Sequence, residues 1–228
     1  MTADANFVAP VGRSSLTERV YDALRQALFE GRLQPGQRLK IRDLAAAMQV
    51  SETPVREALV QLARTGALVM DAARSITVAR LSLAQYLELR TIRLALEGMA
   101  AEAAASRIGS EEIAALEAAH EHYITAERAG DGLEASRWNW AFHSGLYRAA
   151  AMPELMALIE TIWLRNGPMH AVIYPHAPPS YAIRHRHLDV LEALRRRDPV
   201  AAREALQGDL LEGGQNLVRY LQTQAPPA

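Results

Sequence analysis

Apolar residues recur at helical spacing through most of the chain, and between residues 41 and 62 they fall into two short segments. The apolar positions are Ile41, Leu44, Ala45 and Met48 in the first segment, and Val55, Ala58, Leu59 and Leu62 in the second. Only Gln49 and Val50 separate the segments, so the pattern predicts two helices joined by a tight turn. This is the layout of a helix-turn-helix, which favours contact with DNA.

The second of these helices has a clear start. Ser51 is a favourable N-cap, and Pro54 falls in the first turn, where backbone N–H groups lack helical partners. The apolar face leaves Glu52, Thr53 and Arg56 on the outer face. We therefore expect these three side chains to be free to meet a partner surface.

The flanking segments extend the pattern. A helix is expected from Leu16 to about Gly31, before the pair. After it, residues 68–70 and 74–78 are each suited to a short strand, and together they could form a hairpin wing.

On these residues, the segment 13–80 resembles the winged helix-turn-helix of the GntR regulator superfamily. The resemblance rests on the Gly31-to-Gly36 segment ending in Pro35-Gly36, on Leu44-Ala45, and on the run from Thr53 to Leu59. It implies DNA contacts from the following residues: Arg42, Ser51, Glu52, Thr53, Arg56 and Arg74. Glu52 departs from the family, which often has Arg there, and Ser75 stands where the wing usually has Gly. We therefore expect an altered operator preference.

Beyond Leu81 the spacing is helical throughout, which predicts an all-α domain over residues 82–222. About six helices are expected: 82–107, one from 110, 133–151, one from 153 into the 170s, 179–197, and 199 to about 221. The predicted fold class is mainly α, with an N-terminal winged helix-turn-helix and a C-terminal helical bundle.

This second segment resembles the FCD effector domain of the FadR-type branch of the same superfamily. Three passages carry the resemblance: residues 89–98, 139–146 and 187–194. It implies a bundle that binds a small effector, often through a metal held by one Asp and three His.

The expected ligand positions hold Asn139, His143, His187 and Asp209. Asn139 replaces the family's Asp one helical turn before His143, and Asp209 replaces the fourth His. His187 lies 11 residues before Asp198 and Asp209 lies 11 after it, so a helical hairpin would place them level. Because the total ligand charge is unchanged, the carboxylate has moved rather than vanished.

The chain has no cysteine, so a metal site must use nitrogen and oxygen ligands, which suit zinc, nickel, manganese or iron. The alternative is that this branch has lost its metal and that His143 and His187 line a polar cavity. His120 and His122 are expected to be solvated or to face a partner, and His170, His176 and His185 are not expected to be ligands.

An acidic effector needs a fixed positive group. Arg93 is the first candidate and Arg165 a weaker one, because guanidinium matches a carboxylate. Trp138, Trp140 and Trp163 could line the effector pocket or belong to the core.

Charge supports the division into two parts. The net charge of the 228 residues is −1, but residues 1–80 carry 11 Lys and Arg against 8 Asp and Glu, and the remainder 14 against 18. DNA binding needs only a locally basic face. No apolar run approaches the roughly 20 residues that span a bilayer, and no signal region is apparent, so a cytoplasmic location is expected.

The sequence thus predicts a ligand-responsive transcription regulator that forms a homodimer. The dimer is expected to bind a two-fold related double-stranded DNA operator and a small carboxylate effector. Most relatives are repressors, so a repressor is expected. Two other functions stay open. One is a metal-free regulator of a larger apolar ligand such as an acyl-CoA. The more remote one is a metal-dependent enzyme in which Glu97 would act as a base.

Overall fold

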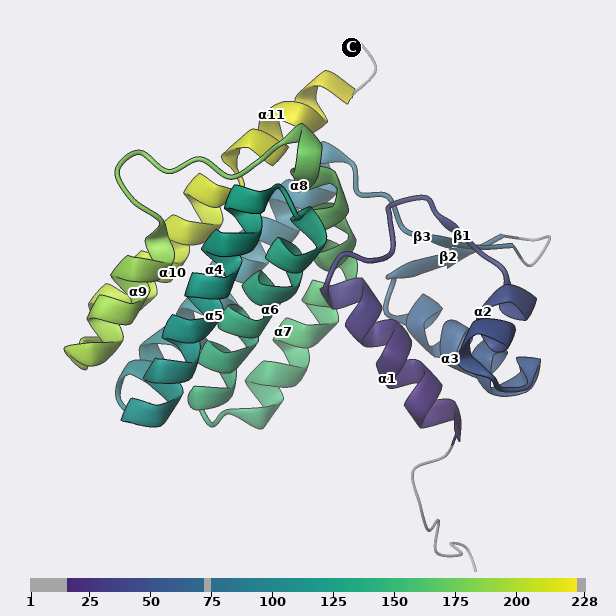
Figure 1. Ribbon diagram of the computed structural model, residues 1–228, viewed down its shortest axis with the longest axis horizontal. Coiled ribbons are helices and arrows are strands. Elements are labelled where there is room, and N and C mark those ends of the chain that lie inside the picture. Colours follow the sequence, from purple (N-terminus) through teal and green to yellow (C-terminus); the bar gives the residue numbers. More distant parts are fainter. Residues whose placement is uncertain (1–15, 72–74, 225–228) are drawn as a thin grey trace, which may run out of the picture.

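A computed structural model describes residues 16–71 and 75–224. A helical bundle occupies one side of the molecule and a small winged domain the other (Figure 1). The first helix, α1 (Leu16–Phe29), runs between them. The fold is mainly helical, which confirms the predicted fold class.

The winged domain contains α1, α2 (Ile41–Met48), α3 (Glu52–Arg64) and a three-stranded antiparallel sheet. The strands are β1 (Arg38–Leu39), β2 (Leu68–Met70) and β3 (Ile76–Val78), in the order β1-β3-β2. In the β2-β3 hairpin, Val69 pairs with Thr77. The helix pair and the hairpin are as predicted, and β1 adds an edge strand that pairs Leu39 with Ile76.

The turn between α2 and α3 closes at Gln49, which adopts a left-handed conformation with φ 55° and ψ 44°. The Gln49 N–H donates to the carbonyl of Ala46, and the Val50 N–H donates to that of Ala45. Ser51 occupies the N-cap of α3 with an extended backbone, but its hydroxyl makes no capping bond. These two bonds close the C-terminal end of α2 just before the chain enters α3.

Four longer helices form the first part of the bundle: α4 (Leu83–Ala105), α5 (Ser110–Ala129), α6 (Gly132–Ala149) and α7 (Pro153–Asn166). The 3₁₀ turn η1 (Gly167–Met169) and the short helix α8 (His170–His176) follow. The chain ends in α9 (Arg186–Arg195), α10 (Pro199–Gly213) and α11 (Gln215–Gln224). α9 and α10 form the hairpin that the Asp198-Pro199 sequence predicts, because Asp198 caps α10 by accepting from the Ala201 N–H at 3.0 Å.

The prediction of about six helices is wrong in number and in boundaries. Residues 83–224 form eight α-helices and one 3₁₀ turn. The helix that starts at Pro153 ends at Asn166, because Pro168 has no N–H to continue the hydrogen-bond ladder. The ninth helix starts at Arg186 rather than near Pro179. The last predicted helix is divided at Gly213 and Gly214, which pack against the hydroxyls of Tyr181 and Tyr86.

One continuous hydrophobic core runs through both domains. Phe29 at the end of α1 packs on Trp140 of α6, with ring centroids 4.3 Å apart. The Arg25 guanidinium donates to the Glu160 carboxylate of α7 at 3.0 Å. Gly167 of η1 packs so closely on the Leu28 carbonyl of α1 that a side chain there would collide with it. The end of α1 is therefore joined to the bundle at η1.

Within residues 16–71 and 75–224, the helices are too short or too polar to cross a membrane.

Candidate functional site

The outer face of α3 carries the side chains that the sequence assigns to DNA. Ser51, Glu52, Thr53 and Arg56 are exposed, whereas Val55 and Leu59 are fully buried against α1 and α2. Arg42 projects from α2 with 87% of its side chain exposed. This division leaves one polar helix face open to a groove.

Glu52 and Arg56 form an ion pair across one helical turn, with the Glu52 Oε2 and Arg56 Nη2 atoms 3.8 Å apart. Both side chains are more than half exposed. Such a pair contributes little to stability. Because the pair is weak, it does not prevent the Arg56 side chain from contacting a phosphate or a base instead of Glu52.

Arg74 lies outside the described residues, so its assigned DNA contact is not located. Of the described residues on either side, the Ser75 N–H donates to the Asp71 carboxylate at 2.7 Å and the Asp71 N–H donates to the Ser75 carbonyl at 3.1 Å. These two bonds join the end of β2 to the start of β3.

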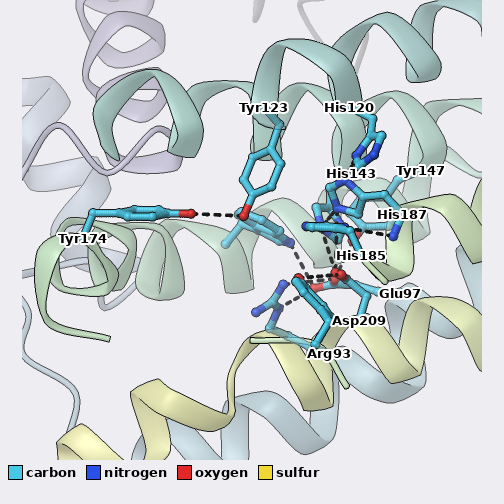
Figure 2. A network of polar contacts seen from close by, with 12 residues as sticks. Arg93, Glu97, His120, Tyr123, His143, Tyr147, Tyr174, His185, His187 and Asp209 are labelled. Carbon is cyan, nitrogen blue, oxygen red and sulfur yellow. Dashed lines mark hydrogen bonds and ion pairs between the residues drawn. The ribbon is translucent and has the colours of Figure 1, made fainter. Parts of the chain in front are cut away.

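In the bundle, His143 of α6, His187 of α9 and Asp209 of α10 meet in the interior (Figure 2). The Nε2 atom of His143 lies 3.4 Å from that of His187 and 3.3 Å from the Asp209 Oδ2 atom. The His187 Nε2 atom lies 3.9 Å from the same oxygen. All three side chains are at most 6% exposed. Three residues that are distant in sequence thus present one ligand atom each to a common point.

The remaining polar atoms of these side chains are also engaged. The His143 Nδ1 atom lies 2.8 Å from the Tyr147 hydroxyl, and the His187 Nδ1 atom lies 3.4 Å from the Nδ1 atom of His120. The Tyr181 hydroxyl donates to the Asp209 Oδ1 atom at 3.0 Å. Outer partners of this kind orient metal ligands and fix their tautomers.

The electrostatic environment suits a cation. Burial opposes the charge of Asp209, but the neighbouring His187 and His143 outweigh it and hold the pKa of this carboxyl below its ordinary value. Burial lowers the pKa of His187 well below that of a free imidazole. A divalent metal needs neutral imidazoles and an ionised carboxylate, so a bound metal would replace the protons through which these histidines attract Asp209.

Asn139, the fourth residue of the predicted set, lies one turn before His143 on α6 and lines the cavity beside the cluster. This cavity has a volume of about 60 Å³. Its polar wall includes Arg93, Asn166, His143 and Asp209. Four phenols also line it: Tyr86, Tyr123, Tyr174 and Tyr181.

The two arginines assigned to an effector have different surroundings. Arg93 lines the cavity, but its Nε and Nη2 atoms donate to Glu97 at 2.6 and 3.2 Å, so its bidentate edge is already used. Arg165 does not line the cavity. Its side chain packs on Gly66, which follows α3, because that face of α7 points toward the winged domain.

The structure contradicts the expectation for His120, and it gives His185 surroundings that the sequence did not indicate. His120 is only 7% exposed rather than solvated, because α5 packs against α9 and turns it toward His187. His185 caps α9 by accepting from the His187 N–H at 3.1 Å, and its ring lies 4.2 Å from the His187 ring. The three form a second cluster beside the first. The His185-x-His187 spacing was the only signal in the sequence.

The three tryptophans do not line the cavity beside the cluster. Trp163 is fully buried, 4.8 Å from the Trp140 ring and 5.6 Å from the His143 ring. Trp138 stacks on His122 at 4.2 Å on the outside of the bundle.

Comparison with known families assigns both parts of the chain. Residues 16–78 match the family described as bacterial regulatory proteins, gntR family, and residues 88–211 match the FCD domain. The HTH-type transcriptional regulator McbR of Escherichia coli strain K12 is 34% identical over 195 residues, which cover 84% of this chain and 88% of McbR. The transcriptional repressor RspR of the same strain is 28% identical, with 86% of each chain covered.

Solved structures agree with this assignment. E. coli McbR/YncC superposes with a TM-score of 0.80 at 30% identity, covering 93% of this chain and 99% of the other. A putative GntR regulator from Rhodococcus sp. RHA1 has the same fold, with a TM-score of 0.71 at 21% identity and 93% and 100% coverage. The family is one of DNA-binding regulators rather than of enzymes. The chain therefore belongs to the GntR family of transcriptional regulators, with an N-terminal helix-turn-helix and a C-terminal FCD domain.

Proposed function

We propose that this regulator binds a divalent metal at His143, His187 and Asp209, and that a small organic acid enters the adjoining cavity and changes operator binding. The observation that carries the proposal is the convergence of two imidazole nitrogens and one carboxylate oxygen on one buried point.

The donor set fits a metal in geometry and in chemistry. With metal–ligand bonds of about 2.1 Å, neighbouring ligands of a tetrahedral site lie about 3.4 Å apart. Two of the three separations in the cluster are 3.3 and 3.4 Å, and the third is 3.9 Å. Nitrogen and oxygen donors suit zinc, nickel, manganese or iron. Asn139 is placed to contribute a weaker, neutral fourth ligand.

A metal-free site is the competing proposal. A proton shared by the His143 Nε2 and Asp209 Oδ2 atoms, which are 3.3 Å apart, would also hold these two side chains together. It leaves the His187 Nε2 atom facing His143 without a defined role. The metal accounts for all three ligand atoms together.

The cavity favours a small effector over an acyl-CoA. The volume beside the cluster, about 60 Å³, holds a few water molecules and is far below the space that a long acyl thioester fills, although a larger hollow of about 790 Å³ shares its Ser136, His170, Tyr174 and Pro179 walls. An acid could be anchored by the metal at one end and by cavity donors at the other. The phenols of Tyr123 and Tyr181 suit this role, and Arg93 contributes positive charge without its bidentate edge.

The cavity wall also offers a route to the DNA-binding helices. Met169 of η1 and His170 of α8 line the cavity, and the same segment packs on Leu28 and Gly31 at the end of α1. α1 in turn packs on α3. A ligand that moves η1 would thus bias the placement of α3, provided that it binds two arrangements unequally.

For DNA, we propose the residue set Arg42, Ser51, Glu52, Thr53, Arg56 and Arg74. We further propose a cytoplasmic homodimer of the FadR-type branch that acts as a repressor on a two-fold related operator. One winged domain would then occupy each half-site.

The deciding experiment is elemental analysis of the protein purified without a histidine tag. We compare the parent, His143→Ala and His176→Ala, the last being an exposed histidine that stacks on Tyr220 at the outer end of α8. About one metal per chain in the parent and in His176→Ala, and loss in His143→Ala, is expected. Equal metal content in His143→Ala would refute the assigned ligands. No metal in the parent after incubation with zinc, nickel and manganese would refute the centre itself.

Binding of an effector is tested separately with the parent protein and His143→Ala. A panel of short carboxylic acids and acyl thioesters is titrated against the metal-loaded protein on DNA selected from random duplexes. Release of DNA by a short acid from the parent but not from His143→Ala supports the proposal. Release by acyl thioesters alone would overturn it.

A further inference from the structure

Glu97 of α4 is a buried carboxylate for which the proposed function has no use. It is 1% exposed, yet it accepts hydrogen bonds from side chains on three helices. Arg93 donates to it at 2.6 and 3.2 Å, and the Trp163 indole N–H donates at 3.0 Å. The Tyr147 hydroxyl also donates to it. Figure 2 shows Glu97 below the histidine cluster, between Arg93 and the cluster.

The chemistry of these groups fixes the direction of each bond. A guanidinium is always protonated, and Glu97 raises the pKa of Arg93 further although burial opposes it. Glu97 forms a bidentate ion pair with this guanidinium in which both carboxyl oxygens accept, so it acts as an acceptor toward Tyr147 as well. The single proton of the Tyr147 hydroxyl therefore points to Glu97, and its oxygen is left as an acceptor.

That acceptor lies 2.8 Å from the His143 Nδ1 atom. The contact is a hydrogen bond only if Nδ1 carries the proton. In neutral His143 the Nε2 atom then has a free lone pair, and this atom faces the Nε2 atom of His187 and the Oδ2 atom of Asp209. The hydrogen bonds from Arg93 to His143 thus favour the tautomer with Nε2 free, against the Asp209 carboxylate 3.3 Å from Nε2, which favours a proton there.

We propose that the chain Arg93–Glu97–Tyr147 is a positioning relay that holds His143 in the tautomer able to bind a metal through Nε2. The proposal rests on the proposed metal centre. Glu97 and Tyr147 act through His143 and would not bind the metal themselves.

The relay differs from the support of the other imidazole ligand. His187 faces another histidine, His120, with their Nδ1 atoms 3.4 Å apart. Either ring could donate across that contact, so it does not select a tautomer. Of the two proposed imidazole ligands, His143 is thus the one whose tautomer the relay favours.

The first test is a spectrum of the metal-free protein, labelled with ¹⁵N-histidine and recorded at pH 8. The His143 signals are identified by their absence in His143→Ala. We expect the Nδ1–H tautomer in the parent and the appearance of the Nε2–H tautomer in Tyr147→Phe. A parent with His143 in the Nε2–H form, or doubly protonated, would overturn the relay.

The second test is metal affinity, measured by competition with a chelator. Loss of a partner of a ligating histidine weakens metal binding by about 10–100-fold, and we expect this for Tyr147→Phe. Tyr220→Phe is the control, because it removes the same hydroxyl from α11, where the Tyr220 ring stacks on His176 and not on a proposed ligand. Unchanged affinity and unchanged tautomer in Tyr147→Phe would refute the proposal.

A second variant covers the case in which Tyr147→Phe disturbs the fold. Arg93→Met combined with Glu97→Gln removes both charges together, so no buried charge is left unpaired. The amide of Gln can donate as well as accept, which removes the fixed direction of the Tyr147 proton. We expect a mixture of His143 tautomers and weaker metal binding. A parent that shows the Nδ1–H tautomer but binds no metal would refute the metal centre and leave the tautomer assignment standing.

Discussion

His187 and Asp209 lie level on neighbouring helices of one hairpin, with the His187 Nε2 and Asp209 Oδ2 atoms 3.9 Å apart although 22 positions separate them. The Asp198 cap lies at the midpoint in sequence, so α9 and α10 bring the two residues back to the same height. Asp209 is the only carboxylate of its three-residue cluster.

We therefore expect Asp209→Asn to weaken metal binding by at least about 10-fold, because the substitution removes the one anionic ligand. Affinity is measured by chelator competition. Glu212→Gln, on the same helix but paired with Arg186 near the surface, is the control and should bind normally. Equal losses in both variants would point to a general effect of charge.

Asn139→Asp should strengthen metal binding by about 10-fold or more. A carboxylate is a better ligand than an amide, and Asn139 lies one turn from His143 at the cavity wall. Asn166→Asp is the matched comparison, because it adds the same charge to the same cavity from α7. A gain in Asn166→Asp alone would mean that Asn139 does not face the metal.

Arg56→Ala should weaken DNA binding by at least about 10-fold and reduce the slope of log affinity against log salt by about one if Arg56 contacts a phosphate. The DNA is selected from random duplexes with the parent protein, and its affinity for each variant is measured by fluorescence anisotropy. Arg195→Ala provides a control in the bundle, where Arg195 pairs with Glu117. Full affinity in Arg56→Ala would remove α3 from the interface.

Gly31→Ala should destabilise the protein by about 2 kcal/mol. A non-glycine residue pays about 1–2 kcal/mol for a left-handed conformation, and Gly31 has φ 67°. An added Cβ there would also lie 3.0 Å from the Cβ atom of His170. Gly130→Ala isolates the first effect, since Gly130 has φ 72° with nothing within 4 Å. Urea unfolding should therefore show a larger loss at Gly31 than at Gly130.

Acidification should destabilise the fold partly through His170. Burial lowers the pKa of His170 to about 3, from 6.5 in the unfolded chain. The unfolded chain therefore takes up a proton first, and stability falls as the pH drops from 6.5 toward 3. Between pH 7 and 5 this amounts to about 1–2 kcal/mol. His170→Phe should show a smaller loss over that interval than His176→Phe, by urea unfolding at each pH.

Local patterns in the sequence were sufficient for the DNA-binding half. The apolar faces of α2 and α3, the turn at Gln49 and the exposure of Arg56 depend on residues within a few positions of each other. Helical spacing and turn chemistry determine such features without the rest of the fold. The proposed ligand set in the bundle was also accessible, because the resemblance points to His143, His187 and Asp209, and the equal spacing about Asp198 supports the last two.

Tertiary structure alone decided what surrounds that set. His120 looked solvated from its own helix, and only the packing of α5 on α9 turns it toward His187. Arg93 looked free to bind a carboxylate. Glu97, one turn further along α4, accepts the hydrogen bonds of the Arg93 guanidinium. Tyr147 and Trp163, on two other helices, also donate to Glu97. A sequence pattern fixes the face on which a side chain lies, whereas its partner depends on which helix packs there, and that is a property of the whole fold.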